Sequence, residues 1–147
     1  MKFTCQVEID LPRKRVVELF DNVNNLKYWQ EGFVSFEHLS GEEGQPGAKS
    51  KLIYKQGKRS IELIETITTR NLPDEFHGMY DHENMRNSMK NYFTELTPKK
   101  TGWDAELDYT IKKGLMLRVM AAVAPGMFRK QSQKWMDNFK KWAEEKG

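Results

Sequence analysis

The sequence contains a single cysteine, Cys5, so its 147 residues cannot form an internal disulfide. A chain that folds without disulfides fits a reducing compartment, and we expect a cytoplasmic protein. No CxxC partner or histidine lies near Cys5 in the sequence. We therefore interpret Cys5 as a small buried residue of a strand rather than a reactive thiol.

Long apolar runs are also missing. Residues 1–5 lack the apolar stretch of a signal peptide. The longest mostly apolar stretch, residues 114–128, contains Arg118 and is interrupted by Pro125-Gly126. It is too short and too interrupted to cross a bilayer, so the sequence predicts no integral membrane segment.

Motifs that would hold a metal or a cofactor are not visible. His77 and His82 are five residues apart on a predicted strand, so their side chains point to opposite faces. Neither an HExxH nor a CxxC pattern occurs, and the glycine-rich loop 41–47 is not followed by the GK[ST] of a phosphate loop. GxSxG and dinucleotide-binding patterns are also missing. We therefore expect no metal and no cofactor, and assign no catalytic residue.

Charge is nearly balanced, with 24 Lys and Arg against 21 Asp and Glu, a net charge of +3. This balance argues against a disordered chain and against a dedicated nucleic-acid-binding protein. Residues 112–147 carry a net charge of +6 and the remainder −3. The simple interpretation is a solvated helix face on a mildly acidic sheet. The alternative is weak contact of this basic C-terminal helix with an anionic membrane surface or partner.

Length and patterning together predict the architecture. A chain of 147 residues suits one domain, here residues 1–147, with a sizeable core. Phe3, Cys5, Val7 and Ile9 alternate with polar residues, as in a half-buried strand. Two short helices follow, the first capped by Asp10. Six further strands are expected at residues 33–39, 49–55, 59–69, 75–82, 85–96 and 103–111.

From Leu115 the apolar period changes to that of a helix. We expect one amphipathic helix of roughly 30 residues, kinked near Pro125. Successive strands joined by short turns should pair antiparallel, and a twisted antiparallel sheet curls and needs a cover on its hollow side. The sequence therefore predicts an α+β fold, a curved antiparallel sheet in the order β-α-α-β6-α wrapped around a long C-terminal helix, with a mainly apolar cavity between them.

Several segments resemble one known superfamily. They are Asp10-Leu11-Pro12, residues 16–20 (VVELF), Asp21 to Trp29, the Asn71-Leu72-Pro73 turn, the hairpin from Phe93 to Trp103, and the closing helix with its proline. The chain resembles the START-like, Bet v 1-like superfamily (SRPBCC, helix-grip fold), in its bacterial polyketide cyclase/dehydrase and lipid-transport branch. The resemblance covers essentially the whole chain. It implies the helix-grip fold and a small hydrophobic or amphipathic ligand, lipid-, sterol- or polyketide-like.

Alternation along the predicted strands suggests which side chains face the ligand. Asn87 and Asn91 share a face with methionines and Phe93, and a buried amide needs a hydrogen-bond partner. Glu65 is an acid on an otherwise apolar face, where burial raises the pKa of an unpaired carboxyl. Packing of these side chains within the core is the competing interpretation. The candidate ligand-binding residues are Trp29, Tyr54, Glu65, Tyr80, Asn87, Asn91, Trp103 and Tyr109.

Three hypotheses for function follow. The first, which we prefer, is a non-enzymatic module that binds a small hydrophobic molecule. The second is an enzyme of the cyclase or dehydratase type, in which Glu65 or a histidine would act as acid or base. The third is a co-chaperone-like interaction module that uses the basic helix. The chain could be a monomer, or a homodimer paired through the edge strand Phe3 to Ile9.

Overall fold

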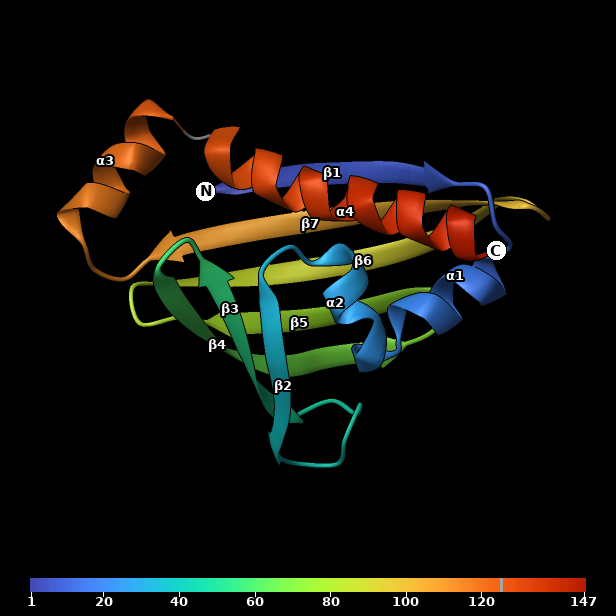
Figure 1. Ribbon diagram of the computed structural model, residues 1–147, viewed down its shortest axis with the longest axis horizontal. Coiled ribbons are helices and arrows are strands. Elements are labelled where there is room, and N and C mark those ends of the chain that lie inside the picture. The colour runs from blue at the N-terminus through green and yellow to red at the C-terminus, as the bar shows by residue number, and fades with distance from the viewer. Residues whose placement is uncertain (125) are drawn as a thin grey trace.

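A computed structural model describes residues 1–124 and 126–147 of the chain. Its elements follow the predicted order of one strand, two short helices, six strands and a helical C-terminus. The bounds are β1 Lys2–Ile9, α1 Arg13–Phe20, the 3-10 turn η1 Val23–Asn25, α2 Leu26–Trp29, β2 Phe33–Ser40, β3 Lys49–Gln56, β4 Arg59–Asn71, β5 Glu75–Asp81, β6 Met85–Thr97, β7 Lys100–Ile111, α3 Leu115–Val123 and α4 Gly126–Lys146. The predicted helix-grip α+β fold is confirmed (Figure 1).

All strands pair antiparallel in one seven-stranded sheet of order β1-β7-β6-β5-β4-β3-β2. Each consecutive pair from β2 to β7 is adjacent, and β1 adds to β7, which makes β1 and β2 the two edges. The helix α4 runs across the sheet alongside β1, and α1 and α2 lie beside its C-terminal end (Figure 1). We call the end of the sheet near α1 and α2 the closed end. The end near α3 and the β5–β6 turn is the open end.

The helical C-terminus differs from the prediction of one kinked helix. It consists of two separate helices, because Ala124 has a non-helical backbone (φ −140°, ψ 59°) at the end of α3. Pro125, where the kink is expected, lies outside the described residues. α4 buries Met136, Phe139 and Ala143, whereas α3 buries no residue and extends away from the sheet beyond the open end (Figure 1). The periodicity correctly predicted helical structure from residue 115 onward, but the prediction of one continuous helix is wrong, and only α4 packs on the sheet.

The start of α1 also differs from the prediction. Pro12, not Asp10, is the N-cap residue, and it makes no side-chain capping bond. The carboxylate of Asp10 instead faces Lys100 at 3.8 Å. Proline at this position is tolerated because the first helical N–H groups have no intrahelical partner.

α4 covers the free edge of β1. Outward carbonyl groups of β1 accept hydrogen bonds from α4: Thr4 from Arg129 at 3.2 Å, Gln6 from Gln133 at 3.0 Å and Glu8 from Lys140 at 2.7 Å. The unpaired backbone groups of an exposed edge strand can pair with a strand of another chain. Carbonyls that already accept hydrogen bonds are less available for such pairing. These bonds oppose pairing through β1, and the choice between a monomer and a homodimer stays a prediction.

The core is densest at the closed end. Five aromatic residues from α1, α2, β6, β7 and α4 pack there with ring centroids 5.0–6.4 Å apart, mostly edge to face. We call them the aromatic cluster: Phe20, Trp29, Phe93, Trp103 and Phe139. Trp103 and Phe139 have no exposed surface. None of the helices within residues 1–124 and 126–147 has both the length and the apolar content needed to cross a bilayer.

Candidate ligand site

Five polar side chains form one row across the concave face of the sheet. Consecutive members are direct cross-strand partners: Ser50 with Glu65, Glu65 with Tyr80, Tyr80 with Asn87, and Asn87 with Tyr109. Directly opposed residues in an antiparallel sheet point to the same face. We call this set the polar row. It crosses β3 to β7 and approaches the open end, since Tyr80, Asn87 and Tyr109 lie close to the ends of their strands.

The strongest contact in the polar row joins Tyr80 and Glu65. The Tyr80 hydroxyl donates to Oε2 of Glu65 at 2.8 Å. Burial raises the pKa of Glu65 above its usual value, and the hydrogen bond from Tyr80 opposes part of that rise. Burial, together with the nearby Glu65 charge, also raises the pKa of Tyr80. The pair therefore favours a neutral tyrosine and shifts the carboxyl toward its protonated form.

Tyr54 and Trp135 flank the Glu65 side of the polar row. The Tyr54 hydroxyl donates to Oε1 of Gln30 at 2.7 Å, and the Tyr54 ring stacks on Trp135 of α4 at 5.3 Å. Burial and the Glu65 charge raise the pKa of Tyr54. The indole Nε1 of Trp135 is buried and has no acceptor among the described residues. A buried donor without a partner is uncommon and needs an explanation.

Tyr109 ends the polar row under the first half of α4. Its ring stacks on Phe3 at 5.5 Å and lies 5.2 Å from the ring of Phe128. Burial raises the pKa of Tyr109, while a hydrogen bond with Ser132 opposes the shift. Residues of α4 thus face both ends of the polar row.

An apolar row lies next to the polar row on its closed-end side. Ile67, Gly78, Met89 and Leu107 are cross-strand partners in succession. Glu65, Tyr80, Asn87 and Tyr109 keep partial exposure although they lie on the concave face. A ligand site needs this combination of apolar wall and a few accessible polar groups.

The eight predicted residues fall into two groups. Tyr54, Glu65, Tyr80, Asn87 and Tyr109 lie in or beside the polar row.

The other three predicted residues lie at the closed end. Asn91 is 2% exposed and its Oδ1 accepts a hydrogen bond of 2.9 Å from Nε1 of Trp103, so these two satisfy each other within the core. Trp29 packs against Phe139 in the aromatic cluster, and its buried Nε1 has no acceptor among the described residues.

Two site residues escaped the sequence prediction. Ser50 shares the alternation of Leu52 and Tyr54 on β3, and that pattern could have placed it on the concave face. Trp135 belongs to the apolar stripe of α4, but its stacking on Tyr54 depends on how the helix crosses the sheet. Helical spacing gives no information on that crossing.

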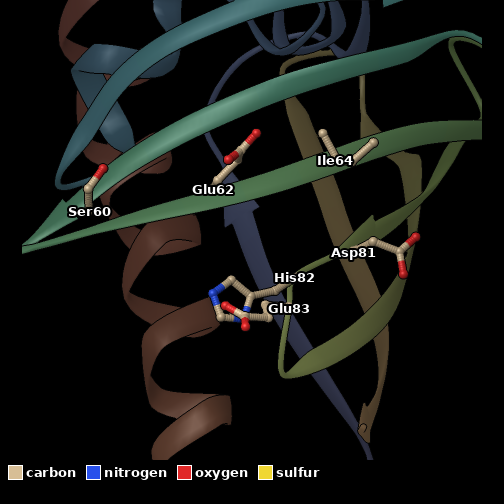
Figure 2. A pocket seen from close by; sticks show the side chains of 6 residues that line it. All are labelled: Ser60, Glu62, Ile64, Asp81, His82 and Glu83. Carbon is tan, nitrogen blue, oxygen red and sulfur yellow. The ribbon is translucent and has the colours of Figure 1, made fainter. Parts of the chain in front are cut away.

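Two surface hollows lie outside the polar row, and neither is lined by a predicted site residue. The first, of about 430 Å³, lies between β4 and the β5–β6 turn, with Ser60, Glu62, Ile64, Asp81, His82 and Glu83 as its lining (Figure 2). Two of its three acids are engaged, because Lys112 contacts Asp81 at 3.0 Å and Lys113 contacts Glu83 at 3.2 Å. The second, of about 690 Å³, lies between α1 and the β4–β5 turn. No three His, Cys, Asp or Glu side chains gather as metal ligands within residues 1–124 and 126–147.

Comparison with known proteins identifies the fold. A conserved protein from Geobacillus kaustophilus superposes with a TM-score of 0.82 at 13% identity, covering 99% of this chain and 96% of that one. The Zhui aromatase/cyclase from Streptomyces sp. R1128 gives 0.80 at 12% identity, with 98% and 93% covered. A START superfamily protein from Mycobacterium smegmatis gives 0.66 at 14% identity, with 90% and 94% covered. The chain has the START fold.

The resemblance found in the sequence is therefore confirmed at the level of fold. No protein-family model matches the chain, and no curated protein sequence matches it. Identities of 10–14% to solved structures carry the START fold and nothing about substrate.

Proposed function

We propose that the chain binds one small, mainly apolar molecule between the polar row and α4, without transforming it. The observation that carries this proposal is the polar row, of which four members beside the apolar row are partly exposed: Glu65, Tyr80, Asn87 and Tyr109. Core packing alone does not require four consecutive polar partners on the concave face, because buried polar groups cost free energy unless they are paired. A bound molecule with one polar end would use them.

The polar row also indicates the chemistry of the ligand's polar end. The polar row contains no Lys or Arg to pair with an anionic headgroup, and burial opposes a charge on Glu65 itself. Nε1 of Trp135, which has no acceptor within residues 1–124 and 126–147, offers a donor beside Tyr54. Asn87 offers both a donor and an acceptor. These groups suit an uncharged hydroxyl or carbonyl oxygen. We therefore propose a neutral lipid-, sterol- or polyketide-like ligand rather than a phosphorylated one.

Native mass spectrometry of the purified chain tests binding directly. We expect one small molecule to remain bound under native conditions and to be released on unfolding. A chain that carries nothing and takes up no added long-chain alcohol such as dodecanol would contradict the proposal.

A pair of tyrosine variants tests the position of the site. Tyr80→Phe removes the hydroxyl that bonds Glu65, and we expect ligand affinity to fall by about tenfold because a buried hydrogen-bond network loses a member. Tyr92→Phe is the matched control, since Tyr92 is paired at 3.5 Å with Glu106 on the opposite face of the sheet. Equal affinities for the two variants would place the ligand elsewhere.

An enzyme is the second candidate, and the burial of the Glu65 carboxyl favours it. A carboxyl whose pKa is raised by burial can serve as a general acid or base. If the ligand is converted, Glu65→Gln should abolish turnover while leaving binding largely intact. Unchanged turnover in Glu65→Gln would exclude Glu65 as the acid or base.

A further inference from the structure

The surface of α3 suggests a second contact, separate from the ligand site. Leu115, Met116 and Val123 are 78%, 77% and 76% exposed, and Val119 and Met127 are also exposed. α3 buries no side chain against the rest of the chain. A contiguous exposed apolar patch on a folded protein usually marks an interaction site.

These side chains share one face of the helix. Leu115, Val119 and Val123 are spaced by four residues, which places them one above another, and Met116 lies beside them. Leu117 and Met120 point elsewhere and are half-buried. The outward face is therefore an apolar stripe, which we define as Leu115, Met116, Val119 and Val123.

Positive charge surrounds the apolar stripe. Arg118 lies within α3, Arg129 and Lys130 follow it, and all three are exposed. Lys112 and Lys113 precede it in surface ion pairs with Asp81 and Glu83. From residue 112 to residue 136 the sequence has no Asp or Glu. Lys112 and Lys113 are paired with acids, whereas Arg118 and Lys130 have no acid in their own stretch of sequence. Apolar side chains flanked by such cations are typical of helices that lie in the interface of an anionic bilayer.

We propose that α3 docks the chain on an anionic lipid bilayer, with the apolar stripe inserted among the acyl chains and the flanking cations against the headgroups. The charge pattern favours this partner over an apolar protein surface, which would not need the cations. The contact is limited to α3 and the start of α4, because the second half of α4 is packed on the sheet through Met136, Phe139 and Ala143. Docking through α3 would bring the open end of the sheet toward the bilayer (Figure 1).

Vesicle flotation with the full chain tests this docking. We expect the chain to float with vesicles of phosphatidylcholine and phosphatidylglycerol, and to float at least about tenfold less with pure phosphatidylcholine or at high salt. No ligand is needed, so failure here and failure of the ligand proposal are distinguishable. A wild-type chain that does not float with anionic vesicles overturns the docking proposal.

Variants decide whether the apolar stripe is responsible. The triple variant Leu115→Ser, Val119→Ser, Val123→Ser should lose at least about tenfold in the floating fraction, because each serine removes apolar surface from the acyl region. The matched control is Val34→Ser with Leu39→Ser, two apolar residues of β2 that are 49% and 48% exposed. That control should float like the wild type. Thermal unfolding would verify that both variants are folded.

Charge variants and self-association provide the remaining outcomes. Arg118→Gln with Lys130→Gln should reduce flotation on anionic vesicles several-fold and leave the weak binding to neutral vesicles unchanged. A triple serine variant that floats like the wild type overturns the proposal. A second result would also overturn the proposal: a chain that binds no vesicles and forms a concentration-dependent dimer in sedimentation velocity, which the triple variant abolishes. In that case a second copy of the chain would cover the apolar stripe.

Discussion

The two ends of the concave face are made by the same strands but do different things. At the closed end Phe93, Trp103 and Phe139 are almost fully buried, and the amide of Asn91 is satisfied by Trp103. At the open end Tyr80 and Asn87 keep partial exposure. The closed end has the features of a core, whereas the open end has the features of a site, with polar groups available to a second molecule.

The difference comes from the helices that cover each end. The second half of α4, together with α1 and α2, fills the closed end with large side chains. Only the first half of α4 approaches the polar row, through Phe128 and Trp135, and α3 turns away from the sheet (Figure 1). Stability and binding are therefore assigned to opposite ends of one sheet, and substitutions should separate them.

The largest effect is expected from Phe139→Ala at the closed end. Removing a fully buried ring from the aromatic cluster should cost about 3–5 kcal/mol in the free energy of unfolding. Phe128→Ala, at the half-buried open end, should cost less than half as much. Urea unfolding of the two variants measures this difference, and equal losses would mean that the two ends are packed alike.

The next effect concerns the two asparagines of β6. Asn91→Leu leaves the buried Nε1 of Trp103 without its acceptor, and we expect a loss of about 1–3 kcal/mol in the free energy of unfolding. Asn87→Leu changes a partly exposed residue, and its cost should stay below about 1 kcal/mol, with the loss appearing in ligand affinity instead. A larger loss of stability in Asn87→Leu than in Asn91→Leu would contradict the assignment of the closed end to the core and of the open end to the ligand site.

Glu65 should make stability depend on pH. Folding raises its pKa above the usual 4.5, so the unfolded chain loses the proton first as pH rises. The contribution of Glu65 is therefore most favourable below pH 4.5 and is lost progressively until the pH passes the folded pKa. Glu65→Gln should remove this decline and be more stable than the wild type at neutral pH.

Unfolding in urea from about pH 4 to about pH 8 provides the measurement for Glu65. The difference between variant and wild type should grow as pH rises. A difference that is constant, or that shrinks, would mean that Glu65 is charged and well solvated.

The smallest effect is expected at α3. Leu115→Ser and Val123→Ser should each change the free energy of unfolding by less than about 0.5 kcal/mol, because both side chains are exposed. Thermal unfolding is sufficient to detect a larger change. A loss above about 1 kcal/mol in either variant would show that the apolar stripe packs against the protein in solution.

Much of the fold could be predicted from local pattern. Period-two alternation in β1 and β7 identified the strands and their buried faces, and Asn87, Asn91 and Glu65 lie on the concave face that alternation indicated. The two short helices and the succession of antiparallel strands also follow from local signals.

The remainder depends on contacts between distant residues. Glu65, Tyr80 and Asn87 form one row because of the register of β4, β5 and β6. Alternation along a single strand does not determine that register. The stripe of α3 and the stripe of α4 have the same helical period, although only one is covered by the sheet. Capping of the β1 carbonyls by α4 joins residues more than a hundred positions apart.

Amide chemical shifts recorded with increasing dodecanol test the central claim most directly. We expect the amide chemical shifts of Glu65, Tyr80 and Asn87 to change in a saturable way. The amide chemical shifts of Phe93 and Trp103 at the closed end should not change. Shifts confined to the convex face, or no saturable shifts at all, would contradict binding at the open end.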